Sequence, residues 1–241
     1  MDWTIINRAP ALNLSNLGLV MAKIREPFRL NYPNQESMKG VVVASAAKNS
    51  HLAETKQQQI VNSASEIFFE KGFHPTTVRM VAKASGMSMG QLYHYISSKD
   101  DVLYLVHKNV YRGLYEHILK AGFERVEDPL ERLLVALRLT LEFITEDKKR
   151  VQFAYSESKY LDKKYLRVVL EMYRQNTICF WRQLLDELDK RKPIGVDLDF
   201  AASFIAHQTV FLALSGWTLK DKPVGKSINL LIKFIIKGLG L

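Results

Sequence analysis

One stretch of the sequence, from Ile60 to Leu103, limits the possible folds more than any other, because it holds the signals for three helices separated by two glycines, of which the second and third are short. Apolar residues recur at helical spacing in the first of these helices: Ile60, Ala64, Ile67 and Phe68. Gly72 can adopt the left-handed conformation that ends a helix, and Phe73 follows as the apolar contact of such a cap. We therefore expect the first helix to end at Gly72.

The next two helices are predicted by residues that cap helices. Thr77 can cap a short helix with its hydroxyl group, and Ser88 can cap another after a turn at Gly86. Leu92 is expected to anchor the second of them to the core. Its other side chains are then left largely on the surface: Met89, Gly90, Gln91, Tyr93, His94 and Tyr95.

Two helices joined by a turn that contains glycine form a helix-turn-helix unit, whose second helix enters the DNA major groove. The helix that begins after Ser98 can present free N–H groups to a phosphate, and Lys99 adds a positive charge there. No acidic residue lies between Glu70 and Asp100, and the whole chain has a formal net charge of +9. These features predict double-stranded DNA as a partner.

The remainder of the chain has helical patterns and no segment that alternates like a strand, so we expect an all-α protein of nine helices. Caps, prolines and apolar spacing predict the later helices from Asp100, over 129–145, over 148–159, over 162–190, from Asp197 and from Pro223. We expect residues 1–50 to form a poorly ordered extension and residues 51–101 the three-helix DNA-binding domain. Residues 102–241 are expected to form a helical domain for ligand binding and dimerisation.

The string from Thr77 to Leu103 strongly resembles the DNA-binding domain of the TetR/AcrR family of bacterial regulators. The matching residues are Thr77, Val81, Ala82, Gly86, Ser88, Gly90, Leu92, Tyr93, Tyr95, Lys99 and Leu103. Ile96 stands where the family usually has phenylalanine, which is a change between two apolar residues. The resemblance covers residues 53–103 in detail, and the length and helix count of the remainder also fit.

This resemblance implies a homodimer that binds a pseudo-palindromic operator, usually as a repressor that a small ligand releases. The implied phosphate contacts come from Tyr93, Tyr95 and Lys99. The implied base contacts come from Arg79, Met89 and Gln91. The rest of the predicted DNA-binding set is Thr77, Ser88, Gly90 and His94. Two alternatives stay open: the two tyrosines are only core aromatics, or the protein is an architectural DNA-binding protein without an effector.

We expect the effector to bind among aromatic side chains of the C-terminal helices, since pockets between helices are mostly apolar with a few polar anchors. The candidate ligand-binding residues are Phe143, Phe153, Tyr173, Trp181, His207 and Phe211. Aromatic residues at helical spacing also fit a plain core, and His207 also fits a polar group at a dimer interface. The segment 155–159 is similar to segments of family members that respond to acyl-CoA thioesters. The expected effector is therefore an acyl-CoA or another hydrophobic compound.

Two apolar segments near the C-terminus predict how the chain associates. Residues 200–219 contain no charged side chain, and residues 228–236 form one apolar helix face. A stretch of about 20 residues could span a bilayer, but several polar side chains interrupt this one, so we expect no membrane partner and a cytoplasmic protein. We expect both segments to form the helical bundle of a homodimer, with Leu212 and Ile232 inside it.

Signals for catalysis are weak, and we expect neither an enzyme nor a cofactor. Gly225-Lys226-Ser227 lacks the earlier glycine and the strand of a phosphate-binding loop. Ser156 and Lys159 have the spacing of a serine–lysine pair without its companion motifs. The single cysteine, Cys179, excludes an internal disulfide and a cysteine metal cluster, and it is expected to be a buried thiol. No His-Glu metal motif is present either, so no metal site is expected.

Overall fold

The computed structural model describes residues 50–241, in which every regular element is a helix. Ten α-helices are joined by turns, short 3-10 helices and one π-helix in this part of the chain. The prediction of an all-α fold is confirmed, whereas residues 1–49 of the predicted extension lie outside the described residues. The described helices form two compact units. We call them the N-terminal unit (residues 50–113 and 147–174) and the C-terminal unit (residues 114–146 and 175–241).

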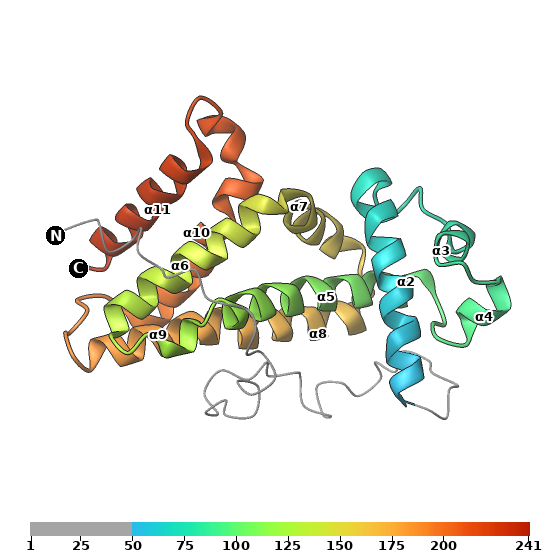
Figure 1. Cartoon of the computed structure of the whole chain (residues 1–241), viewed down its shortest axis with the longest axis horizontal. Helices are drawn as coiled ribbons and strands as arrows, with labels where there is room; N and C mark the ends of the chain where they lie inside the picture. Colours follow the sequence, from blue (N-terminus) through green and yellow to red (C-terminus); the bar gives the residue numbers. More distant parts are fainter. Residues whose placement is uncertain (1–49) are drawn as a thin grey trace. The chain divides into compact units, whose positions relative to one another are not determined.

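The N-terminal unit begins with the three predicted helices, a long one and two short ones. They are α2 (Ser50–Lys71), α3 (Val78–Ala84) and α4 (Met89–Tyr93), and α3 and α4 form a pair beside α2 (Figure 1). Gly72 has a φ of 82° at the end of α2, and the ring of Phe73 packs edge-on against Phe68 with centroids 5.6 Å apart. Both parts of the predicted helix end are therefore confirmed.

Three later helices complete the same core. They are the first part of α5 (Lys99–Lys120), α7 (Lys148–Glu157) and α8 (Lys163–Tyr173). Phe153 of α7 stacks on Phe68 of α2 at 5.6 Å, and Tyr165 of α8 stacks on Tyr104 of α5 at 5.1 Å. The core around α2, α3 and α4 thus includes residues beyond 101, because α5 runs across this position.

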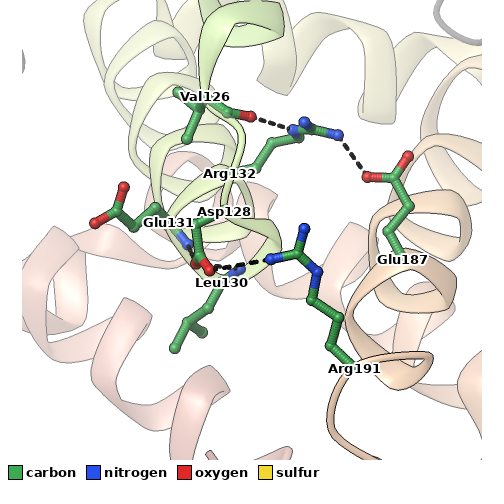
Figure 2. Close-up of polar contacts among 7 residues, drawn as sticks. All are labelled: Val126, Asp128, Leu130, Glu131, Arg132, Glu187 and Arg191. Carbon is green, nitrogen blue, oxygen red and sulfur yellow. Dashed lines mark hydrogen bonds and ion pairs between the residues drawn. The ribbon is translucent and has the colours of Figure 1, made fainter.

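The C-terminal unit is a bundle of α6 (Pro129–Glu146), α9 (Cys179–Asp189), α10 (Leu198–Leu214) and α11 (Val224–Gly238). Polar contacts join the start of α6 to the end of α9, as Figure 2 shows. Arg132 forms an ion pair with Glu187 at 2.5 Å and donates to the carbonyl oxygen of Val126 at 2.6 Å. Asp128 caps α6 by accepting from the backbone of Leu130 and Glu131, both at 3.0 Å. The predicted start of α6 is confirmed.

Three segments depart in detail from the expectations. The helix predicted over 162–190 runs without a break from Lys163 to Asp189, but its middle turn is a π-helix, Arg174–Ile178. Met172 and Trp181 are buried on either side of this turn and are nine residues apart, which places them half a turn out of phase in a regular α-helix. The wider π-turn reduces this phase difference. Helix α10 ends at Leu214 and is followed by a 3-10 helix, Gly216–Leu219. Cys179, the first residue of α9, is half-buried instead of buried.

The apolar faces of α10 and α11 are also arranged differently from the prediction. Leu212 and Ile232, expected inside a dimer, are buried in the core of the single chain, because α10 and α11 pack on α6 and on each other. The large apolar side chains that these two helices leave exposed are Phe200, Phe204, Val224, Leu230 and Phe234. Among the described residues, no helix has the length and apolar character needed to cross a membrane.

Candidate DNA-reading surface and effector region

Helix α3 is capped at its N-terminus by Thr77. Thr77 has an extended backbone, and its hydroxyl oxygen accepts a hydrogen bond from the backbone N–H of Met80 at 3.2 Å. This satisfies one of the N–H groups that a helix start leaves unpaired. Val81 and Ala82 are buried against α2, which leaves Arg79 and Lys83 exposed on the outer side of α3.

Helix α4 starts with a complete capping box. The hydroxyl oxygen of Ser88 accepts from the backbone N–H of Gln91 at 3.2 Å, and the side-chain oxygen of Gln91 accepts from the backbone N–H of Ser88 at 2.9 Å. The turn before it has Gly86 at a φ of 64°, as predicted. Because the box uses only the oxygen of the Gln91 amide, its NH₂ group keeps two donors on an exposed side chain.

The other predicted DNA-binding residues of α4 differ in exposure. Leu92 is fully buried, as predicted, whereas Tyr93 is 48% exposed. Ser88, Gly90 and His94 are also exposed, and Met89 and Tyr95 are half-buried against the core. The backbone carbonyl of Tyr95 accepts from the side chain of Gln57 at 3.3 Å, which ties the end of α4 to α2. The core alternative therefore suits Tyr95 better than Tyr93.

Lys99 has an internal role that the sequence did not reveal. Its ammonium group donates to the carbonyl oxygens of Phe73 at 3.0 Å, His74 at 3.3 Å and Thr76 at 3.0 Å. It also lies 4.1 Å from the centre of the Phe73 ring. An ammonium group has three donors, so the loop between α2 and α3 already occupies all of them. The phosphate contact of Lys99 stays a prediction that competes with this arrangement.

Asp101 links the start of α5 to α8. This buried carboxylate accepts from the backbone N–H of Ser97 at 2.5 Å and from the hydroxyl of Ser98 at 3.1 Å. It also accepts from the hydroxyl of Tyr165, whose pKa is raised by burial and by this hydrogen bond. Glu157, at the end of α7, accepts from the backbone N–H of Phe73 at 3.2 Å. Helices α7 and α8 are therefore bonded directly to the segments on both sides of α3 and α4.

The six predicted ligand-binding residues are divided between the two units. Phe153 and Tyr173 belong to the N-terminal unit, and the other four belong to the C-terminal unit: Phe143, Trp181, His207 and Phe211. Phe153 and Trp181 are buried among other aromatic rings, which fits the plain-core alternative. His207 is exposed, and together with Phe211 it shares the outer face of α10 with Phe200 and Phe204.

A buried polar residue that the sequence did not single out lies in the N-terminal unit. His107 of α5 is 1% exposed, and neither of its ring nitrogens has a hydrogen-bond partner within the described residues. Burial lowers the pKa of His107 to about 4, so the ring is neutral at physiological pH and holds one donor and one acceptor. Its ring centre lies 6.0 Å from that of Phe153. Buried polar groups without a partner are uncommon in folded proteins, so His107 is a candidate for a binding role.

Three tyrosines lie along the same helices. Tyr111 is one turn after His107, and its ring centre is 6.4 Å from that of Tyr173. Tyr155 and Tyr173 are hydrogen-bonded, and burial raises the pKa of Tyr173 to about 12 and that of Tyr111 as well. Tyr155 is 41% exposed, so this cluster extends from the buried His107 region to the surface. We call His107, Tyr111, Tyr155 and Tyr173 the polar cluster; of these, only Tyr173 was among the predicted residues.

Comparison with known proteins identifies the α2–α5 segment. Residues 60–104 match the family model described as bacterial regulatory proteins, tetR family. This segment of the chain is therefore similar to the bacterial regulatory proteins of the tetR family. The matched residues start within α2 and end within α5, so they contain the whole α3–turn–α4 pair. Within the described residues no cluster of potential metal ligands is present.

The relatives match different shares of this chain. It is 30% identical over 132 residues to the HTH-type transcriptional regulator HbdR of Aromatoleum sp. (strain CIB), and this match spans only 55% of each protein. The FadR structure from Bacillus subtilis in complex with stearoyl-CoA matches 75% of the chain and 98% of FadR, with a TM-score of 0.65 and 19% identity. AibR in complex with isovaleryl coenzyme A and operator DNA matches 74% of the chain and 97% of AibR, with a TM-score of 0.62 and 17% identity. At such identities the two structures support the fold alone.

Proposed function

We propose that this protein is a transcription regulator that binds a near-palindromic operator as a homodimer and leaves it when a small effector binds. The observation that carries the DNA-binding part is the surface formed by α3 and α4. It presents Arg79, Lys83, Gln91, Tyr93 and His94, and no acidic side chain lies between Glu70 and Asp100. The match to the HTH-type regulator HbdR supports the same function. Repression, a cytoplasmic location and the absence of enzymatic activity belong to this proposal.

A substitution of Gln91 tests the DNA-binding part, because the oxygen and the NH₂ group of its side-chain amide have separate roles. Gln91→Glu keeps the oxygen that completes the capping box but replaces the NH₂ donors with an acceptor. The variant should fold as the parent does and shift the preferred base at one position of each half-site by about 1–3 kcal/mol. Selection from a randomised operator library measures this shift, and Gln183→Glu in the C-terminal unit controls for the added charge. Equal affinity of the parent for selected and scrambled DNA would defeat the proposal.

The homodimer is supported by the exposed face of α10 and α11. Phe200 is 67% exposed and Phe234 is 64% exposed, with Phe204 and Leu230 also on the surface. Apolar residues gathered on one face mark an interaction site. Half-sites in a palindrome require a two-fold partner, so the occupant that fits this face is a second copy of the chain.

The effector is proposed to bind in the N-terminal unit, between α5, α7 and α8. The polar cluster there combines unpaired buried nitrogens with aromatic neighbours, which is the composition of a site for an apolar ligand with a polar group. The acyl-CoA complexes of FadR and AibR support an acyl-CoA as the first compound to try. Movement of α7 or α8 would act on DNA binding through Glu157–Phe73 and Tyr165–Asp101.

Titration of stearoyl-CoA, isovaleryl-CoA and free CoA into the protein–operator complex tests the release. A hundredfold preference of the effector for the non-binding state shifts the equilibrium by about 2.7 kcal/mol. His107→Leu should abolish the response, whereas Lys190→Gln, at the exposed end of α9, should keep it. Ligands that bind the protein tightly but leave operator affinity unchanged would favour the architectural alternative.

A further inference from the structure

Helix α8 carries apolar side chains outside the core of the N-terminal unit. Leu170 is 56% exposed and Leu166 is half-buried, although both are large apolar residues. They line an open hollow of about 580 Å³ beside four charged side chains: Lys163, Arg167, Glu171 and Arg174. The side chains that α8 buries are Tyr165, Val168, Val169 and Met172. Helix α8 thus has one face in the core and a second, partly apolar face in solvent.

The shape of this hollow fits a helix better than a small molecule. All the residues that line it lie within 163–174, so α8 and the turn after it provide one wall only. Binding pockets bury about 70–90% of the surface of a small ligand, which a single helix face cannot do. A helix laid along α8 brings its own side chains as the opposite wall. The lining residues recur every three or four positions, which is the spacing of such a helix–helix seam.

The charges beside the two leucines are mainly positive. Lys163 and Arg167 are exposed on the same side of α8, and neither forms an ion pair with another described residue. Glu171, one turn further on, forms an ion pair with Arg174 at 2.7 Å. Between positions 159 and 174 the basic residues are Lys159, Lys163, Lys164, Arg167 and Arg174, and the acidic ones are Asp162 and Glu171. A second copy of the chain would bring the same excess of positive charge, so a partner of opposite charge fits this face better.

We propose that an acidic amphipathic helix of a partner protein binds along α8, at a set of residues that we call the α8 stripe: Lys163, Leu166, Arg167 and Leu170. Apolar side chains of that helix pack on the two leucines, and its carboxylates pair with the lysine and the arginine. Tyr165 of α8 donates to Asp101 near the start of α5. The partner would therefore lie on a helix that is bonded directly to the segment after α4.

The probe is a synthetic peptide of about three heptads, with leucine at the core positions and glutamate at the flanking positions. Fluorescence anisotropy should show saturable binding to the full-length protein in the micromolar range. Leu170→Ser should weaken this binding by about fivefold or more, because it removes the more exposed of the two leucines. The double variant Lys163→Glu/Arg167→Glu should lose the glutamate peptide and bind instead a peptide with lysine at the flanking positions.

Two substitutions elsewhere in the N-terminal unit are the matched controls. Leu52→Ser removes a leucine of α2 that is 47% exposed, and Lys149→Glu reverses the charge of an exposed lysine of α7. Both should leave the affinity for the glutamate peptide unchanged. Thermal melts establish that all the variants are folded.

Three results would overturn the proposal. The first is the absence of saturable peptide binding, or equal binding by the parent and by folded variants of the α8 stripe. The second is a change of oligomeric state in Leu170→Ser, measured by sedimentation, which would assign the stripe to a second copy of the chain. The third is binding of the parent to phosphatidylglycerol vesicles that the double variant loses, without binding of the peptide, which would assign the stripe to a membrane surface. Neither operator nor effector is present, so the outcome is independent of the proposed function.

Discussion

The two units of this protein differ in which residues break the usual rule that polar groups lie outside and apolar groups inside. The N-terminal unit buries two ionisable groups, His107 and Asp101, and its Lys99 ammonium group donates to loop carbonyls. The C-terminal unit instead exposes large aromatic groups, with Phe200 and Phe234 on its surface. Buried polar groups and exposed apolar patches are the informative exceptions in a globular protein. The buried groups lie in the unit proposed to bind DNA and effector, and the exposed ones lie on the surface proposed for a second chain.

Phe234→Asp should have the largest effect on function. It places a charge on the exposed apolar face, so the protein should remain folded but become a monomer. A monomer holds one half-site at a time, and operator affinity should fall by about a hundredfold or more. Sedimentation and operator titration measure the two effects.

The matched control for this prediction is Ile232→Asp, two residues earlier on the same helix. Ile232 is buried in the chain's own core, so this variant should lose its helical circular dichroism rather than only its partner. A folded parent that sediments as a monomer at micromolar concentration would remove the distinction between the two positions.

Protonation of His107 should produce the next largest effect, on stability. The pKa is about 4 in the folded protein and about 6.5 in an unfolded chain, so between these values only the unfolded chain binds the proton. Stability should therefore fall as the pH falls from about 6.5 to about 4, by up to about 3 kcal/mol. Urea unfolding at several pH values measures it. His107→Leu should lose this part of the pH dependence, and an unchanged profile would show that His107 is not desolvated.

Removal of the Lys99 side chain separates its internal role from a DNA contact. Lys99→Ala should lower the free energy of unfolding by about 2 kcal/mol, because three loop carbonyls lose a charged donor. The salt dependence of operator affinity should stay the same. If Lys99 contacts a phosphate instead, stability is retained and the salt slope falls by about 0.9, the value for one phosphate.

The smallest effect is expected at Thr77, whose cap lies on the surface. Thr77→Ala removes the acceptor of the Met80 N–H and should cost about 1 kcal/mol of stability. Thr77→Ser keeps the hydroxyl and should restore most of it. Chemical unfolding of the two variants measures how much the cap contributes to the free energy of unfolding. If both variants lose the same stability, the effect belongs to the threonine methyl group and not to the hydroxyl.

The sequence predicts the local features of this fold well. Several of these features depend only on residues within four positions of one another, so the sequence pattern predicts them. They are the caps at Thr77 and Ser88, the left-handed glycines and the start of α6. The exposure of Gln91, Tyr93 and His94, on which the proposed DNA-binding surface depends, is also predictable, because all three lie on or directly after one short helix.

The features that the sequence does not predict depend on residues far apart in the chain. Lys99 reaches carbonyls 23 to 26 residues earlier, and Tyr165 reaches Asp101 across 64 residues. His107 follows five consecutive buried apolar residues of α5, Val102 to Val106, and that apolar run was a signal that its ring is buried. The division of apolar residues between core and surface in α10 and α11 depends on which neighbours cover them, and the pattern within one helix does not contain this information.

On the proposed function, the capping box at the start of α4 also limits how the protein can change its operator. The side-chain oxygen of Gln91 caps α4, the helix proposed to enter the major groove, and the side-chain nitrogen is proposed to contact a base. Most replacements would alter the helix start and the base contact at once, so a new specificity at this position would arrive together with a loss of stability. Glutamate is the replacement that completes the same box. When copies of such a protein diverge, we therefore expect position 91 to change mainly from glutamine to glutamate. Arg79 and His94 are not part of the capping box, so we expect these two positions to vary more freely.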